Sequence, residues 1–454
     1  MYIEQQPIFK DLCPYSGGID TKNRWIKLSK LVPWDEIEPI YRKHFDNSKQ
    51  TVIKSCRLIM GLILGQMLMK LSDVDIVDYF HENPYFQYFC GETTFIPKLD
   101  KRVIHPSLLS KRRHRLGEKY AKAFENEIIK ALKKEGLVKG KKLILDATVF
   151  PADITYPNDV KLLNTVRDYL CKTILIVKNS IDPTRKIRTY RKVARRCYLN
   201  FQKTKRKSSQ FIRRTRKSMI QYVDRNIQQL DGLLAELQIK MNQNVPLFKQ
   251  WHYDHILEQI AVSKTILEQQ IHMATTRGRS VANRIVSFHR PEIRPVVRGK
   301  EGTSVEFGPK AHIALVDGYA ILDDCQFEPF NEGIRLVDSL ESHRVRFDRN
   351  PELILADQLY ANRYNRQHLN ELSISHSFKR TGRPPNESPT EKQKHQRTFR
   401  KRQGQRNHVE ATIGHLKNDF NLDKVTWSVP GGAIMQIHFG LIASNLHKAS
   451  LAMT

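Results

Sequence analysis

Three charged residues in the segment Arg406–Phe420, RNHVEATIGHLKNDF, have types and spacing that could hold a metal ion and a phosphate together. Arg406, Glu410 and Lys417 follow one another at offsets of four and seven, so a helix would carry them on one face. An apolar stripe beside them predicts the buried side of that helix: Val409, Ile413, Leu416 and Phe420. Taken alone, the charged row is more typical of an ordinary surface ion-pair row.

Two earlier segments supply further carboxylates. KKLILDATVF and PELILADQLY each contain a short run of Leu and Ile that stops at an aspartate, Asp146 and Asp357. Such a run is typical of a buried central strand that ends at a carboxylate. Together with Glu410, the two aspartates could converge on a pair of Mg²⁺ ions, which prefer hard oxygen ligands. Two ions roughly 3.5–4 Å apart can activate a nucleophile and stabilise a leaving oxygen during in-line attack at phosphorus.

Five other aspartates lie near these segments: Asp153, Asp159, Asp317, Asp323 and Asp338. Asp153 comes after Pro151, where we expect the strand to have ended. Asp317 precedes Gly318 and fits better as a hairpin turn residue. Asp323 and Asp338 do not end an apolar run. We therefore prefer Asp146, Asp357 and Glu410 as the catalytic and metal-binding residues.

The composition indicates a globular protein with a polyanionic partner. The chain has 454 residues, 40% hydrophobic and 27% charged, with a net charge of +29. Such an excess usually serves nucleic acid, although a ribosomal or chromatin protein shows the same balance. The most apolar stretch, Leu58–Met69, is too short to span a bilayer and predicts a buried helix. Six scattered cysteines without a C-x-x-C pair favour reduced thiols in the cytosol, without a zinc site.

A mid-chain block of positive charge predicts contact with nucleic acid. Residues Arg185–Lys217 include 15 Lys or Arg and no Asp or Glu, with aromatic residues interleaved. We interpret the block as part of a helical insertion that lies along phosphates; a solvated face is the alternative. The N-terminal helical domain could add a helix-turn-helix, or simply be a helical bundle with solvated cations. The expected phosphate-binding residues of both parts are Arg191, Lys192, Arg195, Arg196, Arg213, Arg214, Lys111 and Arg112.

The order of elements predicts a fold of mixed α+β and α/β character. We expect an N-terminal helical, DNA-end-binding domain over residues 1–139, a catalytic core over 140–160 and 291–454, and the insertion over 161–290. The core reads as the Asp146 strand, a hairpin, a helix, the Asp357 strand, a helix, a further strand, a basic loop over 379–402 and the Glu410 helix.

This is the order of a ribonuclease-H-like fold, a mixed sheet flanked by helices. In that fold the first and fourth strands lie side by side. Asp146 and Asp357 would therefore meet despite the 211 positions between them.

Four segments resemble the DDE transposases of bacterial insertion sequences, in the insertion-sequence-five group. They are LILDATVFPADITYPNDVKLLN, EFGPKAHIALVDGYAILDD, LILADQLYANRYNR and RNHVEATIGHLKNDFNLDKV, and the resemblance extends over roughly residues 25–450. The last segment also resembles the Tyr-(2)-Arg-(3)-Glu-(6)-Lys signature of related transposases. Arg406, Glu410 and Lys417 match that signature, whereas Gln403 stands at the tyrosine position.

The resemblance implies metal-dependent cleavage at the ends of an insertion sequence and strand transfer into target DNA. Asp146 would bridge two Mg²⁺ ions, for which Mn²⁺ is a substitute, and Asp357 and Glu410 would each complete the ligands of one ion. Arg406 and Lys417 would hold neighbouring phosphates. The implied partner is double-stranded DNA, both terminal repeats and target, bound by a homodimer in the bacterial cytoplasm at the nucleoid, without a membrane. The alternatives are a domesticated, inactive DNA-binding protein and a metal-dependent nuclease.

Overall fold

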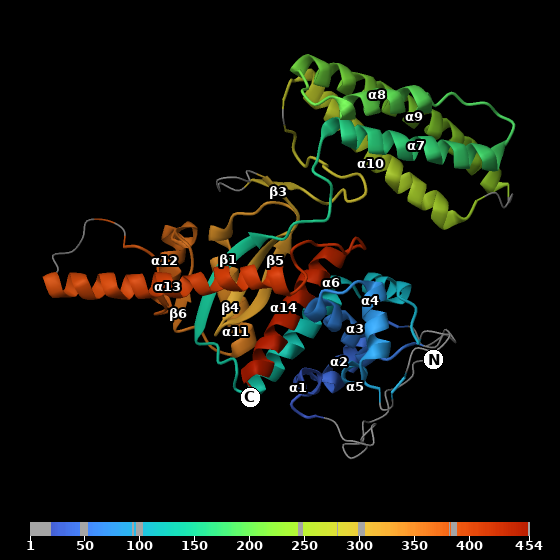
Figure 1. Cartoon of the computed structure of the whole chain (residues 1–454). Coiled ribbons are helices and arrows are strands. Elements are labelled where there is room, and N and C mark those ends of the chain that lie inside the picture. The colour runs from blue at the N-terminus through green and yellow to red at the C-terminus, as the bar shows by residue number, and fades with distance from the viewer. Residues whose placement is uncertain are drawn as a thin grey trace. The chain divides into compact units, whose positions relative to one another are not determined.

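The computed structural model divides the chain into two compact units (Figure 1). Unit 1 comprises Met1–Asp153 and Gly308–Thr454, and unit 2 comprises Ile154–Phe307. Unit 1 thus contains both the predicted N-terminal domain and the strands predicted for the core, and unit 2 contains the predicted insertion. The structure describes residues 20–45, 53–92, 95–96, 103–243, 248–278, 280–297, 305–380, 382 and 388–452.

A five-stranded mixed sheet forms the centre of unit 1, in the order β5-β4-β1-β6-β7. β1 runs antiparallel to β4 and parallel to β6, β4 is antiparallel to β5, and β6 is parallel to β7. The strands are β1 (Lys142–Val149), β4 (Lys310–Val316), β5 (Tyr319–Gln326), β6 (Leu353–Leu355) and β7 (Ser375–His376). The predicted mixed sheet is therefore present, and the first predicted strand lies beside the one that leads to Asp357.

The predicted hairpin turn at Asp317-Gly318 is confirmed. Both residues have positive φ, 51° and 89°, as a tight turn between β4 and β5 requires. The Asp317 carboxylate accepts hydrogen bonds from the backbone N–H groups of Lys139 and Lys142 at 2.8 and 3.0 Å. The turn residue therefore also holds the segment that leads into β1.

The N-terminal half of unit 1 is a helical bundle. It comprises α1 (Arg24–Leu31), α2 (Trp34–Arg42), α3 (Cys56–Met69), α4 (Asp73–Glu82), α5 (Pro84–Phe89) and α6 (Ser107–Lys134). Residues 56–67 of α3 are all buried, which confirms the predicted core helix. α6 bends at Gly117, where φ is 67° and ψ is −171°, and its second half packs inward through Phe124 and Ile128. The described residues include no helix long and apolar enough to cross a bilayer.

The bundle and the sheet share one hydrophobic core through α14 (Gly432–Ala452), which packs against α3, α6 and β5. The Asn445 side chain pairs with the backbone N–H and C=O of Ala320 at 2.8 and 2.7 Å. The fully buried Glu125 of α6 accepts from the Leu322 N–H and lies 3.2 Å from Nδ1 of His438. Because buried polar groups need partners, these contacts fix the two helices against β5.

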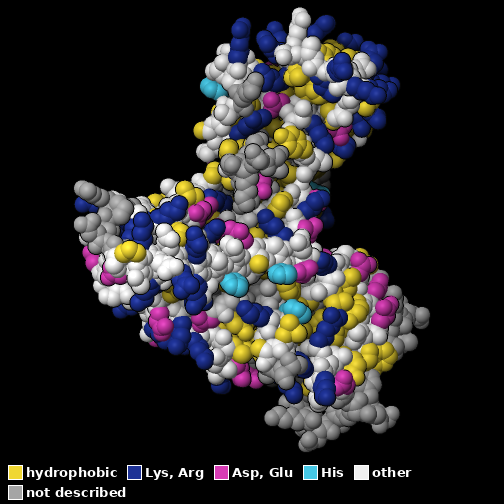
Figure 2. All heavy atoms as spheres, turned by 60° about the vertical axis from the view of Figure 1, so that its left-hand side comes forward, with side chains coloured by type: hydrophobic (Ala, Val, Ile, Leu, Met, Phe, Trp, Pro, Cys, Tyr) yellow, Lys and Arg dark blue, Asp and Glu magenta, His cyan; other side chains and the backbone are white. Residues whose placement is uncertain are grey.

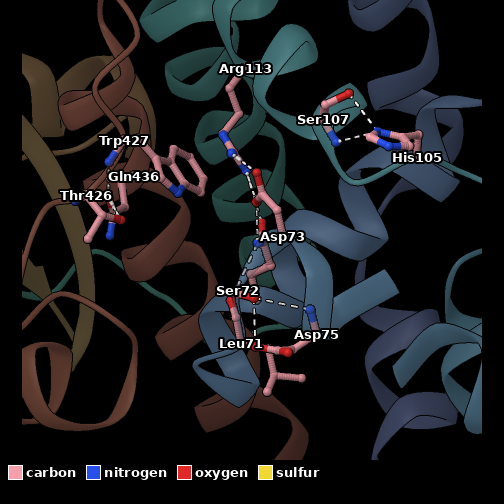
Figure 3. A network of polar contacts seen from close by, with 11 residues as sticks. Leu71, Ser72, Asp73, Asp75, His105, Ser107, Arg113, Thr426, Trp427 and Gln436 are labelled. Carbon is pink, nitrogen blue, oxygen red and sulfur yellow. Dashed lines mark hydrogen bonds and ion pairs between the residues drawn. The ribbon is translucent and has the colours of Figure 1, made fainter. Parts of the chain in front are cut away.

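A second polar network links α4 and α6 to the segment before α14 (Figure 3). The Arg113 guanidinium donates to both carboxylate oxygens of Asp73, at 2.8 and 2.5 Å, and lies 4.5 Å from the ring centroid of Trp427. Gln66 also donates to Asp73, at 2.7 Å. Ser72 caps the start of α4 by accepting from the backbone N–H of Asp75.

The remaining helices of unit 1 lie around the sheet: α11 (Leu336–Phe347), α12 (Arg363–Glu371) and α13 (Pro389–Asp419), with 3₁₀ turns η1 (Glu332–Ile334) and η2 (Gln358–Tyr360). The prediction of a loop over residues 379–402 is wrong from residue 389 onward, because α13 begins there; residues 381 and 383–387 lie outside the described part. A capping box formed by Ser388 and Glu391, with Pro389 in the first turn, starts the helix.

Unit 2 is a helical body with its own apolar core. It contains α7 (Asp159–Ile181), α8 (Arg191–Lys203), α9 (Ser209–Asn242) and α10 (Gln250–Thr275). α7 packs along α9, and α8 contacts both. β3 (Val305–Phe307) pairs with β2 (Pro295–Val297) in a separate two-stranded sheet and not with the core strands.

Candidate active site

The register between β1 and β6 brings the two predicted aspartates to the same level. Ile144 pairs with Leu355 in parallel, and Asp146 and Asp357 each lie two residues further along. The expectation that the first strand ends at Asp146 is wrong, because β1 continues to Val149 by pairing with β4. Asp357 follows the end of β6 and caps η2, where its carboxylate accepts from the Gln358 N–H.

Asp146 is a half-buried carboxyl whose charge is poorly compensated. It accepts a hydrogen bond from the Ala147 N–H at 2.9 Å. Burial raises the pKa of Asp146 to about 6, and the nearby negative charges of Glu332 and Glu410 act in the same direction. The Ala147 N–H and the positive charge of Arg406 lower that pKa in part. Two of the predicted site residues, Glu410 and Arg406, are therefore within electrostatic reach of a third.

Helix α13 carries Glu410 to the sheet by packing on both β1 and β6. The predicted apolar stripe is confirmed, since all four members are buried: Val409, Ile413, Leu416 and Phe420. Arg406 Nη2 lies 3.0 Å from Glu410 Oε1, and the exposed fractions of the two side chains are 20% and 55%. Two members of the charged row, Arg406 and Glu410, therefore form an ion pair that is open to solvent and near Asp146.

Lys417, the third member of that row, makes contacts within the protein. Its Nζ donates to Thr148 Oγ1 at 3.1 Å and to the Val149 carbonyl at 2.8 Å. It also lies 5.6 Å from the ring centroid of Phe150. Lys417 thereby fixes α13 against the last residues of β1.

The donor chemistry of Asp146, Asp357 and Glu410 fits Mg²⁺, because all three offer carboxylate oxygens. Burial is the main cause of the raised pKa of Asp146, with the negative charges of Glu332 and Glu410 adding to it, and a bound cation would favour the ionised form. Throughout the described residues, no group of three or more His, Cys, Asp and Glu side chains is arranged to hold a metal ion. The structure thus brings together the strands and the helix that carry the three carboxylates without a converged ligand set.

A further acid, Glu332, belongs to the surroundings of Asp146 and was not singled out from the sequence. It lies in η1, and its Oε1 is 2.8 Å from Lys310 Nζ. The Asn365 side chain donates to the carbonyls of Gly333 and Tyr360, at 2.7 and 2.8 Å, and so ties η1 to η2. The approach of η1 to η2 depends on these contacts, which are distant in sequence.

A buried tyrosine and histidine lie behind Asp357. The hydroxyl of Tyr360 is 2.8 Å from Nε2 of His312, and both side chains are buried. Burial raises the pKa of Tyr360, and the charges of Glu332, Asp146 and Asp357 raise it further. Burial lowers the pKa of His312, so the imidazole is neutral at pH 7. The pair holds the loop after Asp357 against β4.

The predicted phosphate-binding residues of unit 2 are exposed along α8 and the start of α9. They are Arg191, Lys192, Arg195, Arg196, Arg213 and Arg214. α8 packs through Ala194 and Phe201, which leaves most of its circumference for cations. Figure 2 shows Lys and Arg side chains gathered over the helices of this unit. Such a surface suits a polyanion.

The two predicted cations of the N-terminal bundle differ in their surroundings. Lys111 is exposed on the first part of α6. Arg112 is half-buried, its guanidinium carbon lies 4.7 Å from the ring centroid of Phe45, and burial lowers its pKa. The basic residues therefore lie on the short segment before Gly117, whereas the longer segment after it packs into the core.

Comparison with known proteins finds a family that part of the chain resembles. Residues 15–115 match the family described as Transposase domain (DUF772). This stretch of the chain is therefore similar to a transposase domain. The match confirms the predicted relationship to insertion-sequence transposases. The matched region covers α1–α5 and the first part of α6, including the Arg113–Asp73 pair.

The curated proteins include a relative of unknown activity. "Uncharacterized protein ORF8 in nfe locus" of Rhizobium meliloti is 25% identical over 147 residues, which are 32% of this chain and 69% of that protein. No solved structure matches this chain. Any chemical role must therefore be argued from the geometry of the site.

Proposed function

We propose that this protein is a DDE transposase that cleaves DNA at insertion-sequence ends and joins the freed 3′ end to target DNA. The observation that carries the proposal is the parallel register of β1 and β6, which aligns Asp146 with Asp357 while α13 packs on both strands. The family match to a transposase domain supports the same conclusion from an independent part of the chain. The sheet order, with β1 between β4 and β6, supports a ribonuclease-H-like core.

The proposed roles follow from the surroundings of each side chain. Asp146, Asp357 and Glu410 would hold two Mg²⁺ ions, or Mn²⁺ in their place. When bound, these ions supply Lewis acidity to the attacking and leaving oxygens. Arg406 orients the Glu410 carboxylate through their ion pair and offers its remaining N–H groups to phosphate oxygens.

Other residues position these groups or bind the rest of the DNA. Lys417 fixes the helix that carries Glu410 to the end of β1. Because its ammonium group donates to these protein groups, it would attract a nearby phosphate through its positive charge. The exposed cations of α8 and α9, with Lys111 and Arg112, would bind the phosphates of the element end. Since two ends must be held together, we expect a homodimer in the DNA complex, acting at the bacterial nucleoid.

The reaction proceeds in two displacements at phosphorus. Water attacks the phosphodiester at the element end, which breaks the bond to the 3′ oxygen and leaves a 3′-OH and a 5′-phosphate. The 3′-OH then attacks a phosphodiester of target DNA and displaces a second 3′ oxygen. The protein supplies alignment and electrostatic stabilisation for both steps, without a covalent enzyme intermediate.

A strand-transfer assay tests the proposal. Purified protein is incubated with Mg²⁺, target DNA and a labelled duplex that carries the element's end, beside an Asp357→Asn variant and an Asp348→Asn control. Asp348 is 84% exposed at the end of α11, in a left-handed conformation that Asn tolerates well.

Joined products from the wild type and the control, lost in Asp357→Asn while DNA binding persists, are expected. Cleavage without joining by the wild type would instead identify a nuclease. Binding without cleavage in Mg²⁺ or Mn²⁺ would identify an inactive DNA-binding protein.

A further inference from the structure

The first half of α13 is a helix that projects from the sheet. Residues 389–402, here called the basic arm, are exposed except for partial cover on Phe399 and Arg402, and the first buried residue of the helix is Val409. Figure 1 shows this end of α13 extending away from the strands on which its other half packs. Tertiary packing therefore does not account for the helical state of the arm.

The positive charges of the arm destabilise it as an isolated helix. The arm contains one acid, Glu391, and six cations: Lys392, Lys394, Arg397, Arg400, Lys401 and Arg402. Lys394, Arg397 and Arg400 repeat at intervals of three, and Lys401 follows Arg397 by four. Like charges at these spacings lie side by side on a helix and repel.

The single acid of the arm, Glu391, belongs to the capping box with Ser388 at the start of the helix. Among the described residues, none of Lys392, Lys394, Arg397, Arg400 and Lys401 forms an ion pair, whereas Arg402 donates to the His376 carbonyl. A helix that is polar all round is normally stabilised by many such pairs or by a partner. The missing counter-charge is therefore expected from a polyanion.

We propose that the basic arm binds the DNA duplex that flanks the scissile phosphate at the element end. The inference rests on the proposed function, since it takes Glu410 to lie beside that phosphate. α13 is continuous from the arm to Glu410, so the arm is fixed relative to the site. Lys392 lies 18 residues before Glu410, about 27 Å along a helix with a rise of 1.5 Å per residue. At 3.4 Å per base pair, the arm reaches about 8 base pairs from the cut.

The choice of the flanking duplex, rather than target DNA, follows from this rigid connection. The element end is the duplex that has its phosphate at Glu410 in the first displacement, so it must pass the same helix, whereas target DNA enters only for the second displacement. Lys and Arg bind phosphates irrespective of sequence, so the arm adds affinity and register without reading bases. Its contribution therefore depends on flanking length and on salt.

The test measures binding to an element-end duplex in EDTA, so that cleavage does not enter. The variant is Lys394→Gln/Arg397→Gln/Lys401→Gln, because Gln keeps helix propensity and removes charge. A matched control, Lys122→Gln/Lys130→Gln/Lys134→Gln, removes the same charge from the second half of α6. Circular dichroism verifies that both variants are folded.

Each lost phosphate contact makes the slope of log K against log salt less steep by about 0.9, so the slope of the arm variant should be less steep by about 2.7. Between 50 and 200 mM salt, its loss of affinity becomes about 40-fold smaller than that of the wild type. The control retains the wild-type slope. Trimming the flank on one side below about 8 base pairs weakens the wild type and leaves the arm variant unaffected.

An unchanged slope in the arm variant, or equal sensitivity of both proteins to trimming, would overturn the proposal. A variant that loses affinity only for unrelated target duplexes would overturn it as well. Failure of the proposed function would be detected separately, by DNA joining that persists in the Asp357→Asn variant. That result would not change the binding data measured in EDTA.

Discussion

Asp146→Asn should stabilise the metal-free protein at neutral pH. The carboxyl is half-buried and faces the negative charges of Glu332 and Glu410, so its ionised form is disfavoured in the folded state. Asn has the same shape and still accepts the hydrogen bond from the Ala147 N–H, but it has no charge to desolvate. A residue retained for chemistry at the expense of stability is expected to behave in this way.

The magnitude follows from the pKa of Asp146, which rises from its ordinary 3.8 to about 6 on folding. Each unit corresponds to about 1.4 kcal/mol, so the ionised carboxylate costs about 3 kcal/mol above pH 7. At pH 4 the carboxyl is largely protonated in the folded state and nearly half protonated in the unfolded state, and the cost is only about 0.6 kcal/mol.

The sign follows from proton binding. Between pH 4 and 6 the folded state binds more protons at this group than the unfolded state, so its contribution to stability falls as pH rises. The stability of Asp146→Asn relative to the wild type should therefore increase by about 2.5 kcal/mol from pH 4 to 7.5.

Urea unfolding in EDTA at several pH values measures this difference. Trp25, Trp34 and Trp427 lie in unit 1 and Trp251 in unit 2, so a Trp251→Phe background makes fluorescence report unit 1 alone. Trp251 is 60% exposed, so its replacement should be benign. Asp348→Asn is the matched control and should show no such pH dependence. A constant difference between Asp146→Asn and the wild type across this range would refute the reasoning.

Three further substitutions test the packing of unit 1 by urea unfolding. Arg113→Met leaves the Asp73 carboxylate without its guanidinium partner and should cost about 3 kcal/mol, part of which Asp73→Leu in the same chain should restore. Gly65→Ala adds a methyl group that would lie 2.5 Å from an aromatic side chain of α5, and should cost about 1–3 kcal/mol of stability. An unchanged unfolding midpoint would show that α3 and α5 can separate freely. Tyr360→Phe removes the hydroxyl bonded to His312 and should cost about 1 kcal/mol, with strand transfer reduced if the pair holds the Asp357 loop.

The sequence by itself determined the local features. The apolar stripe of α13 and the Asp317-Gly318 turn depend on residues within a few positions of each other, and both are as predicted. The helical start at Ser388 was equally local, since its capping box was present in the sequence. It was missed because the polar residues that follow have no apolar periodicity, the signal on which helix prediction chiefly depends.

Only the tertiary structure decided which residues meet. The alignment of Asp146 with Asp357 depends on a strand register set by pairing across the whole insertion, and no local pattern encodes it. The continuation of β1 past Asp146 depends on β4, and the approach of Glu332 depends on the amide of Asn365. Side-chain spacing specifies which face of an element is buried, but the charge around a carboxyl is set by neighbours from other elements, which packing alone brings near.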